Sequence, residues 1–171
     1  MKKIISYCLL FCFCTLFFTT CKKYPEGPKV SLRTKMARIT GVWDVEYYEV
    51  DGIDSTSYIL NSPYYYRYYF QRGPGACISK EMHPLDLIMV NQVSQKHCCG
   101  WDISDSKDYI YIEVPAASQF YSFFPLGGIV KGGWDIQRLT NKELWLKLSD
   151  IYVKYHNHNY YMKLKKVSEK P

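Results

Sequence analysis

The seven residues 64–70 contain six aromatic rings around a single arginine. Because side chains alternate between the two faces of a strand, these residues divide into two rows. One row holds Tyr64, Tyr66, Tyr68 and Phe70, and the other holds Tyr65, Arg67 and Tyr69. We expect the row that ends at Phe70 to face a protein interior.

The inward row allows two interpretations. Tyrosines with an apolar ring and one hydroxyl could line a cavity for a small apolar or aromatic molecule, or they could fill a solid core. The outward row of Tyr65, Arg67 and Tyr69 offers a different chemistry, because exposed aromatic rings around an arginine are typical of binding hot spots. Ligand binding inside and partner binding outside are therefore both open.

Three of the seven cysteines lie beyond residue 21. Cys77, Cys98 and Cys99 are an odd number, so they cannot all pair internally. In an oxidising compartment we expect a disulfide between Cys77 and either Cys98 or Cys99, since neighbouring cysteines bridge each other only with strain. In a reducing niche all three are expected to be free thiols.

No pattern in the chain predicts catalysis or a metal site. The runs His97-Cys98-Cys99 and His156-x-His158 lack the ligand spacings of zinc sites. The chain also lacks a Gly-x-Ser-x-Gly motif, and no Ser or Cys has a recognisable catalytic context. We therefore expect a protein that is not an enzyme and that uses no metal and no cofactor.

The N-terminus has the layout of a signal peptide. Two lysines precede an apolar run over residues 4–18, which is shorter than the ~20 residues of a spanning helix. The next residues, Phe18-Thr19-Thr20-Cys21, resemble a bacterial lipobox, which implies cleavage after residue 20 and acylation of Cys21. The alternative is a plain secreted protein that is cut near this point.

Composition bounds the remainder to one domain. Without residues 1–20 the chain keeps 151 residues, with 20 basic and 16 acidic side chains, for a net charge of +4. This mild charge does not favour a nucleic-acid partner. Residues 21–30, with two prolines and a glycine, are expected to form the acylated cysteine and its tether, and residues 31–171 the domain.

Turn chemistry divides the domain into short alternating runs. Ser31 is expected to cap one short helix over residues 32–39. The expected strands are 41–50, 64–71, 76–80, 85–93, 99–103, 109–114, 134–139, 144–148 and 160–167. Their short connections predict an antiparallel meander, and eight or nine such strands close most economically into a barrel. The aromatic segment 118–128 is expected to be either a functional loop or a further strand.

Several motifs resemble one family of proteins. The Gly41-Val42-Trp43 run after a short helix resembles the opening of lipocalins. Tyr68-x-Phe70-x-x-Gly73, Gly100-Trp101-Asp102-Ile103 and the run WDIQRLTNKELWLKL over residues 134–148 are similar to bacterial lipocalin-like lipoproteins. The resemblance implies an all-β, eight-stranded up-and-down barrel with Trp43 at its closed end. An arginine usually covers that tryptophan, whereas the last strand here offers only lysines.

The resemblance also implies a non-catalytic protein tethered by lipid to the outer membrane. We expect it to hold a small apolar or aromatic molecule inside the barrel. The alternative is a solid barrel that binds a protein or glycan through its outward aromatics and the 118–128 segment. No acidic run follows Cys21, which favours the periplasmic face of the outer membrane over the cell surface.

Overall fold

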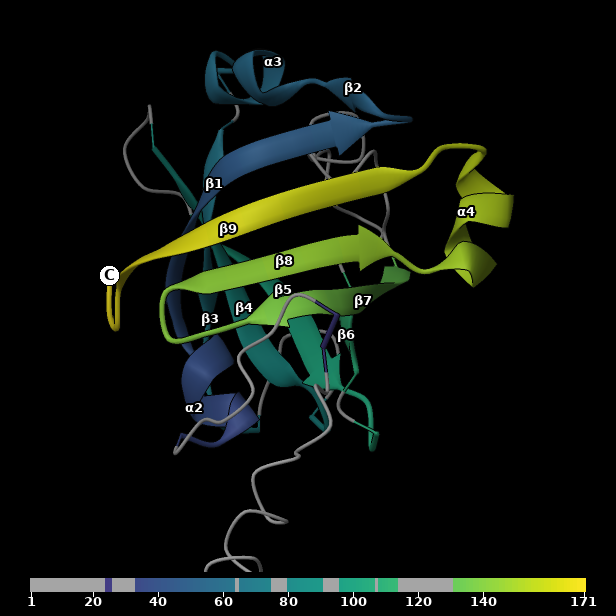
Figure 1. Cartoon of the computed structure of the whole chain (residues 1–171). Coiled ribbons are helices and arrows are strands. Elements are labelled where there is room, and N and C mark those ends of the chain that lie inside the picture. Colours follow the sequence, from purple (N-terminus) through teal and green to yellow (C-terminus); the bar gives the residue numbers. More distant parts are fainter. Residues whose placement is uncertain are drawn as a thin grey trace, which may run out of the picture.

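The described part of the chain folds into a β-barrel with three short helices (Figure 1). A computed structural model describes residues 24–25, 33–63, 65–74, 80–90, 96–106, 108–113 and 131–171. The helices are α2 (Lys35–Ile39), α3 (Thr56–Leu60) and α4 (Asp150–His156). The strands are β1 (Gly41–Val50), β2 (Ile53–Asp54), β3 (Tyr66–Phe70), β4 (His83–Met89), β5 (Lys96–Ile103), β6 (Tyr109–Glu113), β7 (Lys131–Leu139), β8 (Glu143–Leu148) and β9 (Tyr160–Ser168).

Pairing of the first long strand with the last one closes the sheet. The strand order is β2-β1-β3-β4-β5-β6-β7-β8-β9, all neighbours are antiparallel, and β1 also pairs with β9. Strand β1 and strands β3 to β9 thus form a closed eight-stranded barrel, to which β2 adds a short extra strand. The predicted all-β, antiparallel up-and-down barrel is confirmed, and closure leaves no edge unpaired on the ring.

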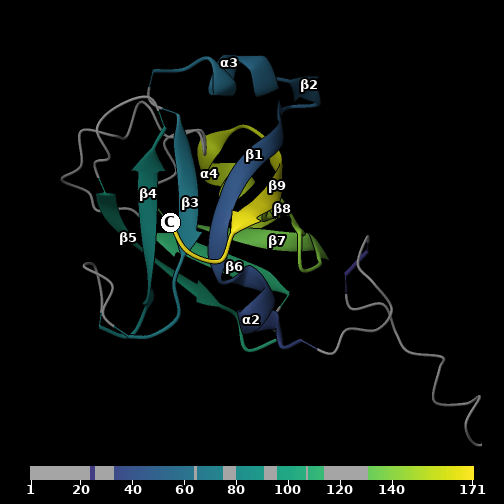
Figure 2. The same cartoon turned by 90° about the vertical axis from the view of Figure 1, so that its left-hand side faces the viewer.

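The two ends of the barrel differ. Helix α2 precedes β1 at one end, called the α2 end here, while α3 lies at the opposite end (Figure 2). Val50, the last residue of β1, pairs with Tyr160, the first residue of β9, so α4 also enters the barrel at that opposite end. We call this the α4 end.

Alternate residues of every barrel strand pack into the interior. Three tryptophans, Trp43, Trp101 and Trp134, are completely buried there. Their neighbours include the rows Leu85, Leu87 and Met89 from β4, Leu144, Leu146 and Leu148 from β8, and Tyr160, Met162 and Leu164 from β9. Burial of each large apolar side chain contributes about 1.5–3 kcal/mol, which makes this alternation the main reason for the fold.

A β-bulge in β1 changes which residues face inward. Its register against β9 shifts between Val45 and Tyr47. Val45 and Tyr48 are both buried, whereas Tyr47 between them points outward and is half-buried. Strict alternation from Trp43 would have placed Tyr47 inside, so the bulge is what brings Tyr48 into the barrel.

Helix α2 begins later than the sequence predicted. Its cap is Thr34, whose side chain accepts a hydrogen bond from the Ala37 amide at 3.2 Å, and Ser31 lies outside the described residues. Helices α3 and α4, with five and seven residues, were not predicted because they are too short to show a helical period. The expected strand 76–80 lies outside the described residues except for Lys80, which is in a turn.

Trp43 closes the α2 end of the barrel. Its indole N–H donates to the Ile39 carbonyl at 2.6 Å, which ties strand β1 to helix α2. The Lys166 ammonium lies 5.0 Å from the Trp43 ring centroid and donates to the Thr40 carbonyl at 2.6 Å. A lysine of the last strand thus covers the tryptophan at the place where the family resemblance implies an arginine. Burial lowers the pKa of Lys166.

Substitution Lys166→Ala tests this contact. The side chain of Lys166 is 6% exposed, and its loss removes a charge-assisted hydrogen bond and a cation–π contact, so we expect a loss of about 2 kcal/mol in the free energy of unfolding. The matched control is Lys165→Ala, which changes an exposed lysine of the same strand. Urea titration measures both variants, and equal stability of the two would contradict the role given to Lys166.

Candidate functional site

The predicted inward row is buried in the barrel wall. Tyr66, Tyr68 and Phe70 are completely inaccessible, and Tyr64 lies outside the described residues. The Phe70 ring meets the Trp101 ring edge-on, with centroids 5.3 Å apart. Burial raises the pKa of Tyr68 well above its ordinary value. These rings belong to the central core, and none of them lines the cavity described below.

The predicted outward row faces solvent only in part. Arg67 is half-exposed and pairs with Asp44 at 3.2 Å, and Tyr69 is half-buried. Tyr65 is 6% exposed, so the expectation that it meets solvent is wrong. It lies just before β3 and is therefore outside that strand's alternation. Its hydroxyl accepts from the Val45 amide at 3.0 Å and donates to the Asp44 carboxylate, and burial raises its pKa.

Two tyrosines that the sequence analysis did not single out lie together at the α4 end. Tyr48 and Tyr160 are buried on neighbouring strands, with ring centroids 6.3 Å apart. Within the described residues neither hydroxyl has a hydrogen-bond partner. Burial raises the pKa of both, which keeps the phenols neutral and able to donate. Only the bulge in β1 reveals this pair, and no residue type marks a bulge in the sequence.

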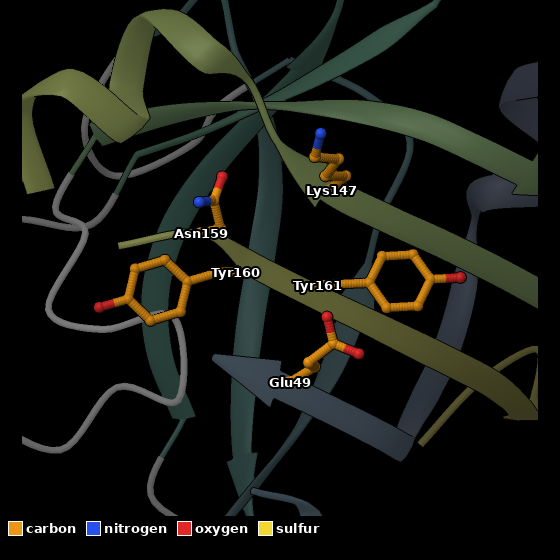
Figure 3. A pocket seen from close by; sticks show the side chains of 5 residues that line it. All are labelled: Glu49, Lys147, Asn159, Tyr160 and Tyr161. Carbon is orange, nitrogen blue, oxygen red and sulfur yellow. The ribbon is translucent and has the colours of Figure 1, made fainter. Parts of the chain in front are cut away.

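A cavity of about 520 Å³ opens beside this pair (Figure 3). The side chains that line it are Glu49, Lys147, Asn159, Tyr160 and Tyr161. Figure 3 shows Tyr160 and Tyr161 on opposite sides of β9, with Glu49 and Lys147 flanking that strand. Tyr161 faces the outer surface, whereas Tyr160 is buried at the edge of the barrel interior. The cavity therefore reaches from the outer surface to that edge at the α4 end.

Register places three of these side chains in one cross-strand row. Tyr161 of β9 pairs with Lys147 of β8 on one side and with Glu49 of β1 on the other. Since neighbouring strands are about 4.8 Å apart, the ammonium-bearing and carboxylate-bearing positions are about 10 Å apart across an aromatic ring. Neither Glu49 nor Lys147 is in a salt bridge among the described residues, so the Lys147 ammonium and the Glu49 oxygen that Tyr47 does not hold can meet a ligand.

Hydrogen bonds hold the Glu49 carboxylate of this row and the backbone of Asn159 beside it. Glu49 accepts from the Tyr47 hydroxyl at 2.7 Å, an interaction that raises the pKa of Tyr47 to about 12. The Asn159 backbone amide donates to the Asp51 carboxylate at 2.8 Å, and His158 Nδ1 lies 2.6 Å from the other Asp51 oxygen. The Asn159 bond and then the His158 contact lower the pKa of Asp51. The site is thus positioned before any ligand arrives.

A second cross-strand row covers the outer face nearer the α2 end. It alternates aromatic and cationic side chains, Tyr47, Lys163, Trp145 and Arg138, from β1 to β7. The Lys163 ammonium lies 4.6 Å from the Trp145 ring centroid and 5.0 Å from that of Tyr47. The Arg138 guanidinium lies 5.0 Å from the Trp145 centroid and pairs with Glu143 at 2.9 Å. The cations therefore occupy the faces of these rings.

The cysteine predictions are settled only for Cys99. It is buried with a free thiol, and burial raises its pKa to about 12. The alternative that pairs it with Cys77 is therefore not formed in this structure. Cys77 and the side chain of Cys98 lie outside the described residues, so their pairing stays a prediction.

Other predicted features lie beyond the described residues or find no counterpart in them. Cys21 and the segment 118–128 are outside the described part of the chain. No group of three or more His, Cys, Asp or Glu side chains in that part is arranged to hold a metal ion. Nor does any helix there have the length and apolar composition required to span a bilayer.

Removal of one hydroxyl tests the inner position of Tyr65. Tyr65→Phe leaves the Val45 amide and the Asp44 carboxylate without a shared partner, and we expect a loss of about 1–3 kcal/mol in unfolding free energy. Tyr69→Phe, which removes a hydroxyl from the outward face of the same strand, is expected to cost less than about 0.5 kcal/mol. Urea denaturation compares the two, and a larger cost for Tyr69→Phe would contradict the assignment.

Thiol labelling tests the burial of Cys99. In the folded chain at pH 8 we expect iodoacetamide to leave Cys99 unmodified over a period in which the urea-unfolded chain is fully alkylated, because the thiol is inaccessible and protonated. Peptide mass spectrometry measures the modified fraction. Equal rates in folded and unfolded protein would contradict the buried position.

Comparisons with known proteins give fold similarity alone. No family model and no curated protein matches the chain. The chain is similar to a solved lipocalin-like protein from Bacteroides uniformis ATCC 8492, with 13% identity, coverage of 76% of this chain and 99% of that one, and a TM-score of 0.46. An uncharacterized protein from Bacteroides eggerthii DSM 20697 is similar at 14% identity, 75% and 98% coverage, and a TM-score of 0.44.

Proposed function

We propose that this chain is a non-catalytic, lipid-anchored binding protein of the outer membrane that holds a small molecule at the α4 end of its barrel. The molecule has an apolar or aromatic body, which packs against the Tyr160 ring beside Tyr48, and a polar group, which reaches the row of Lys147, Tyr161 and Glu49. The anchor is acylated Cys21, and the periplasmic face is favoured.

The observation that carries this proposal is the pair of tyrosine hydroxyls at the α4 end. Tyr48 and Tyr160 are buried, yet their hydroxyls find no partner among the described residues. Neither hydroxyl oxygen is among the fully buried unpartnered side-chain atoms of the described residues, so each keeps some exposed surface, and a hydrogen bond to a ligand acceptor there would contribute about 0.5–1.5 kcal/mol. The adjoining 520 Å³ cavity is within the usual range for ligand pockets.

The polar lining of the cavity supports binding over catalysis. Glu49 is held as an acceptor by Tyr47, Lys147 is a donor, and the Asn159 side chain supplies both functions. The lining contains no Ser, Cys or His, and the positions of its carboxylate and ammonium are about 10 Å apart across Tyr161, so no nucleophile is paired with a base there. The arrangement can fix a ligand's orientation without activating it.

Calorimetric titration of the chain from residue 22 with 2-naphthoate and with neutral 2-naphthol tests the proposal. Both probes have an aromatic body, and only the first has an anionic group for Lys147. We expect one site per chain. Tyr48→Phe/Tyr160→Phe is expected to weaken both probes about tenfold through the loss of two hydrogen bonds, and Lys147→Gln to weaken 2-naphthoate alone.

The control variant is Tyr58→Phe, which alters an exposed tyrosine of α3 outside the cavity. It should bind both probes like the unaltered chain. Absence of binding by the unaltered chain, or identical affinities in Tyr48→Phe/Tyr160→Phe, would contradict the proposal. Mass spectrometry of the N-terminal peptide tests the anchor separately, since an unmodified Cys21 would contradict acylation.

A second candidate function is partner binding by the outer row of Tyr47, Lys163, Trp145 and Arg138. The favouring observation is that these four side chains form one continuous cation–π ladder on the outer face. Arg67 and Tyr69 are less suited, because Arg67 is engaged by Asp44. Arg138→Gln alters the ladder at Trp145, and the contacts of Arg138 with Trp145 and Glu143 involve no residue of the cavity lining, so it should leave probe binding unchanged under the leading proposal. Loss of binding in that variant alone would favour this candidate.

A further inference from the structure

Tyr24, which precedes the first helix and strand, packs against the barrel. It is 3% exposed and belongs to the main core cluster, although it lies within the segment that the sequence analysis expected to be a tether with little to bury. The Lys35 ammonium lies 5.3 Å from its ring centroid. Burial raises the pKa of Tyr24 to about 12, with Arg38 of α2 acting in the opposite direction and Asp108 adding to the rise.

These neighbours place Tyr24 at the α2 end of the barrel. Lys35 and Arg38 belong to α2, and Asp108 lies in the connection between β5 and β6, which meets the barrel at the same end. Arg38 donates to the Leu139 carbonyl at 2.8 Å, which ties α2 to the last residue of β7. The chain is therefore held against the barrel only three residues after Cys21.

The length of free chain follows from this contact. An extended chain spans at most about 3.3–3.6 Å per residue, so Cys21 and Tyr24 are at most about 10 Å apart. Without the Tyr24 contact the free segment would extend 14 residues to Lys35 and could reach about 50 Å. The docking of one tyrosine decides whether the barrel is held at a fixed end or moves freely on its anchor.

The side of the α2 end that lies next to the C-terminus carries several cations. Arg33, Lys142, Lys165 and Lys170 are exposed there, and the Lys166 amide donates to the Lys142 carbonyl, which joins the β7–β8 turn to the end of β9. Acidic residues lie among them too. Arg33 and Lys166 both lie 3.6 Å from the Glu169 carboxylate, and Lys165 pairs across strands with Glu143 and Asp44. Asp102 and Asp105 lie on the β5–β6 side of the same end. Cations close to a bilayer favour contact with anionic headgroups.

We propose that the α2 end of the barrel is a membrane-docking surface, occupied by the phospholipid bilayer that holds Cys21. This inference rests on the proposed anchoring of the chain. Docking through Tyr24 keeps the α2 end close to the anchored Cys21 and therefore close to the headgroups. It also points the α4 end, with Tyr48, Tyr160 and their cavity, away from the membrane and toward dissolved ligands.

Lysine labelling of the full chain in membranes tests the orientation. The chain is extracted, reconstituted into vesicles of phosphatidylethanolamine and phosphatidylglycerol, and acetylated with an N-hydroxysuccinimide ester, with the detergent-solubilised chain as the reference. Peptide mass spectrometry then gives one labelling rate for each lysine. We expect vesicles to slow Lys142 and Lys165 at the α2 end at least fivefold and to leave Lys147 and Lys154 at the α4 end unchanged.

Tyr24→Ala separates docking from simple attachment. This variant should still float with the vesicles, but its Lys142 and Lys165 should be acetylated as fast as in the detergent-solubilised chain. In Tyr24→Phe the two lysines should remain protected by the vesicles. The matched control is Tyr58→Ala. Tyr58 lies at the opposite end of the barrel and is 81% exposed, so this variant should behave like the unaltered chain. The buried Lys166 reports on folding, because it should stay slow in every folded variant.

Each remaining outcome decides the matter. A floating chain with equal labelling changes at both ends, or with protection that survives Tyr24→Ala, overturns the docking surface and leaves the anchor intact. A chain that carries no acyl group on Cys21 and fails to float overturns the anchor and the docking surface together. Protection of Lys147 and Lys154 in place of Lys142 and Lys165 would show the reverse orientation.

Discussion

The pairing of β1 with β9 is the constraint on which the rest of this structure depends. It closes the eight strands β1 and β3 to β9 into a ring. The same seam brings Lys166 over Trp43 at one end, places Tyr48 beside Tyr160 at the other, and aligns Glu49 with Tyr161 on the outer face. Residues more than 100 positions apart in the chain thereby become neighbours in the barrel wall. The groups that we assign to ligand binding lie on these two strands, beside them on β8, or just before β9.

The two ends of this seam have different chemistry. At the α2 end, hydrogen bonds from Trp43, Arg38 and Lys166 join the helix, the first strand and the last strand into a closed base. At the α4 end, polar groups face a cavity, and two phenols have no partner among the described residues. A rigid base and a polar, unsatisfied opposite end suit a protein that presents one end to ligands and keeps the other for attachment.

Much of the barrel could be predicted from alternation, because each strand has one apolar face that must be buried. The inward direction of Tyr66, Tyr68 and Phe70 follows from the same rule. The candidate site could not be predicted in this way. Tyr48 faces inward because of a bulge, Tyr65 is buried because it precedes its strand, and Lys166 covers Trp43 through a contact between the two ends of the chain. None of these three arrangements has a local sequence pattern.

The central claim is that the α4 end of the β1–β9 seam holds the ligand. Amide chemical shifts of the isotope-labelled chain, recorded before and after addition of 2-naphthoate, test this most directly. We expect the perturbed amides to concentrate at 47–50, 146–148 and 159–162, with saturation at one equivalent. Shifts concentrated around Arg67 and Tyr69, or no shifts at all at saturating probe, would contradict it.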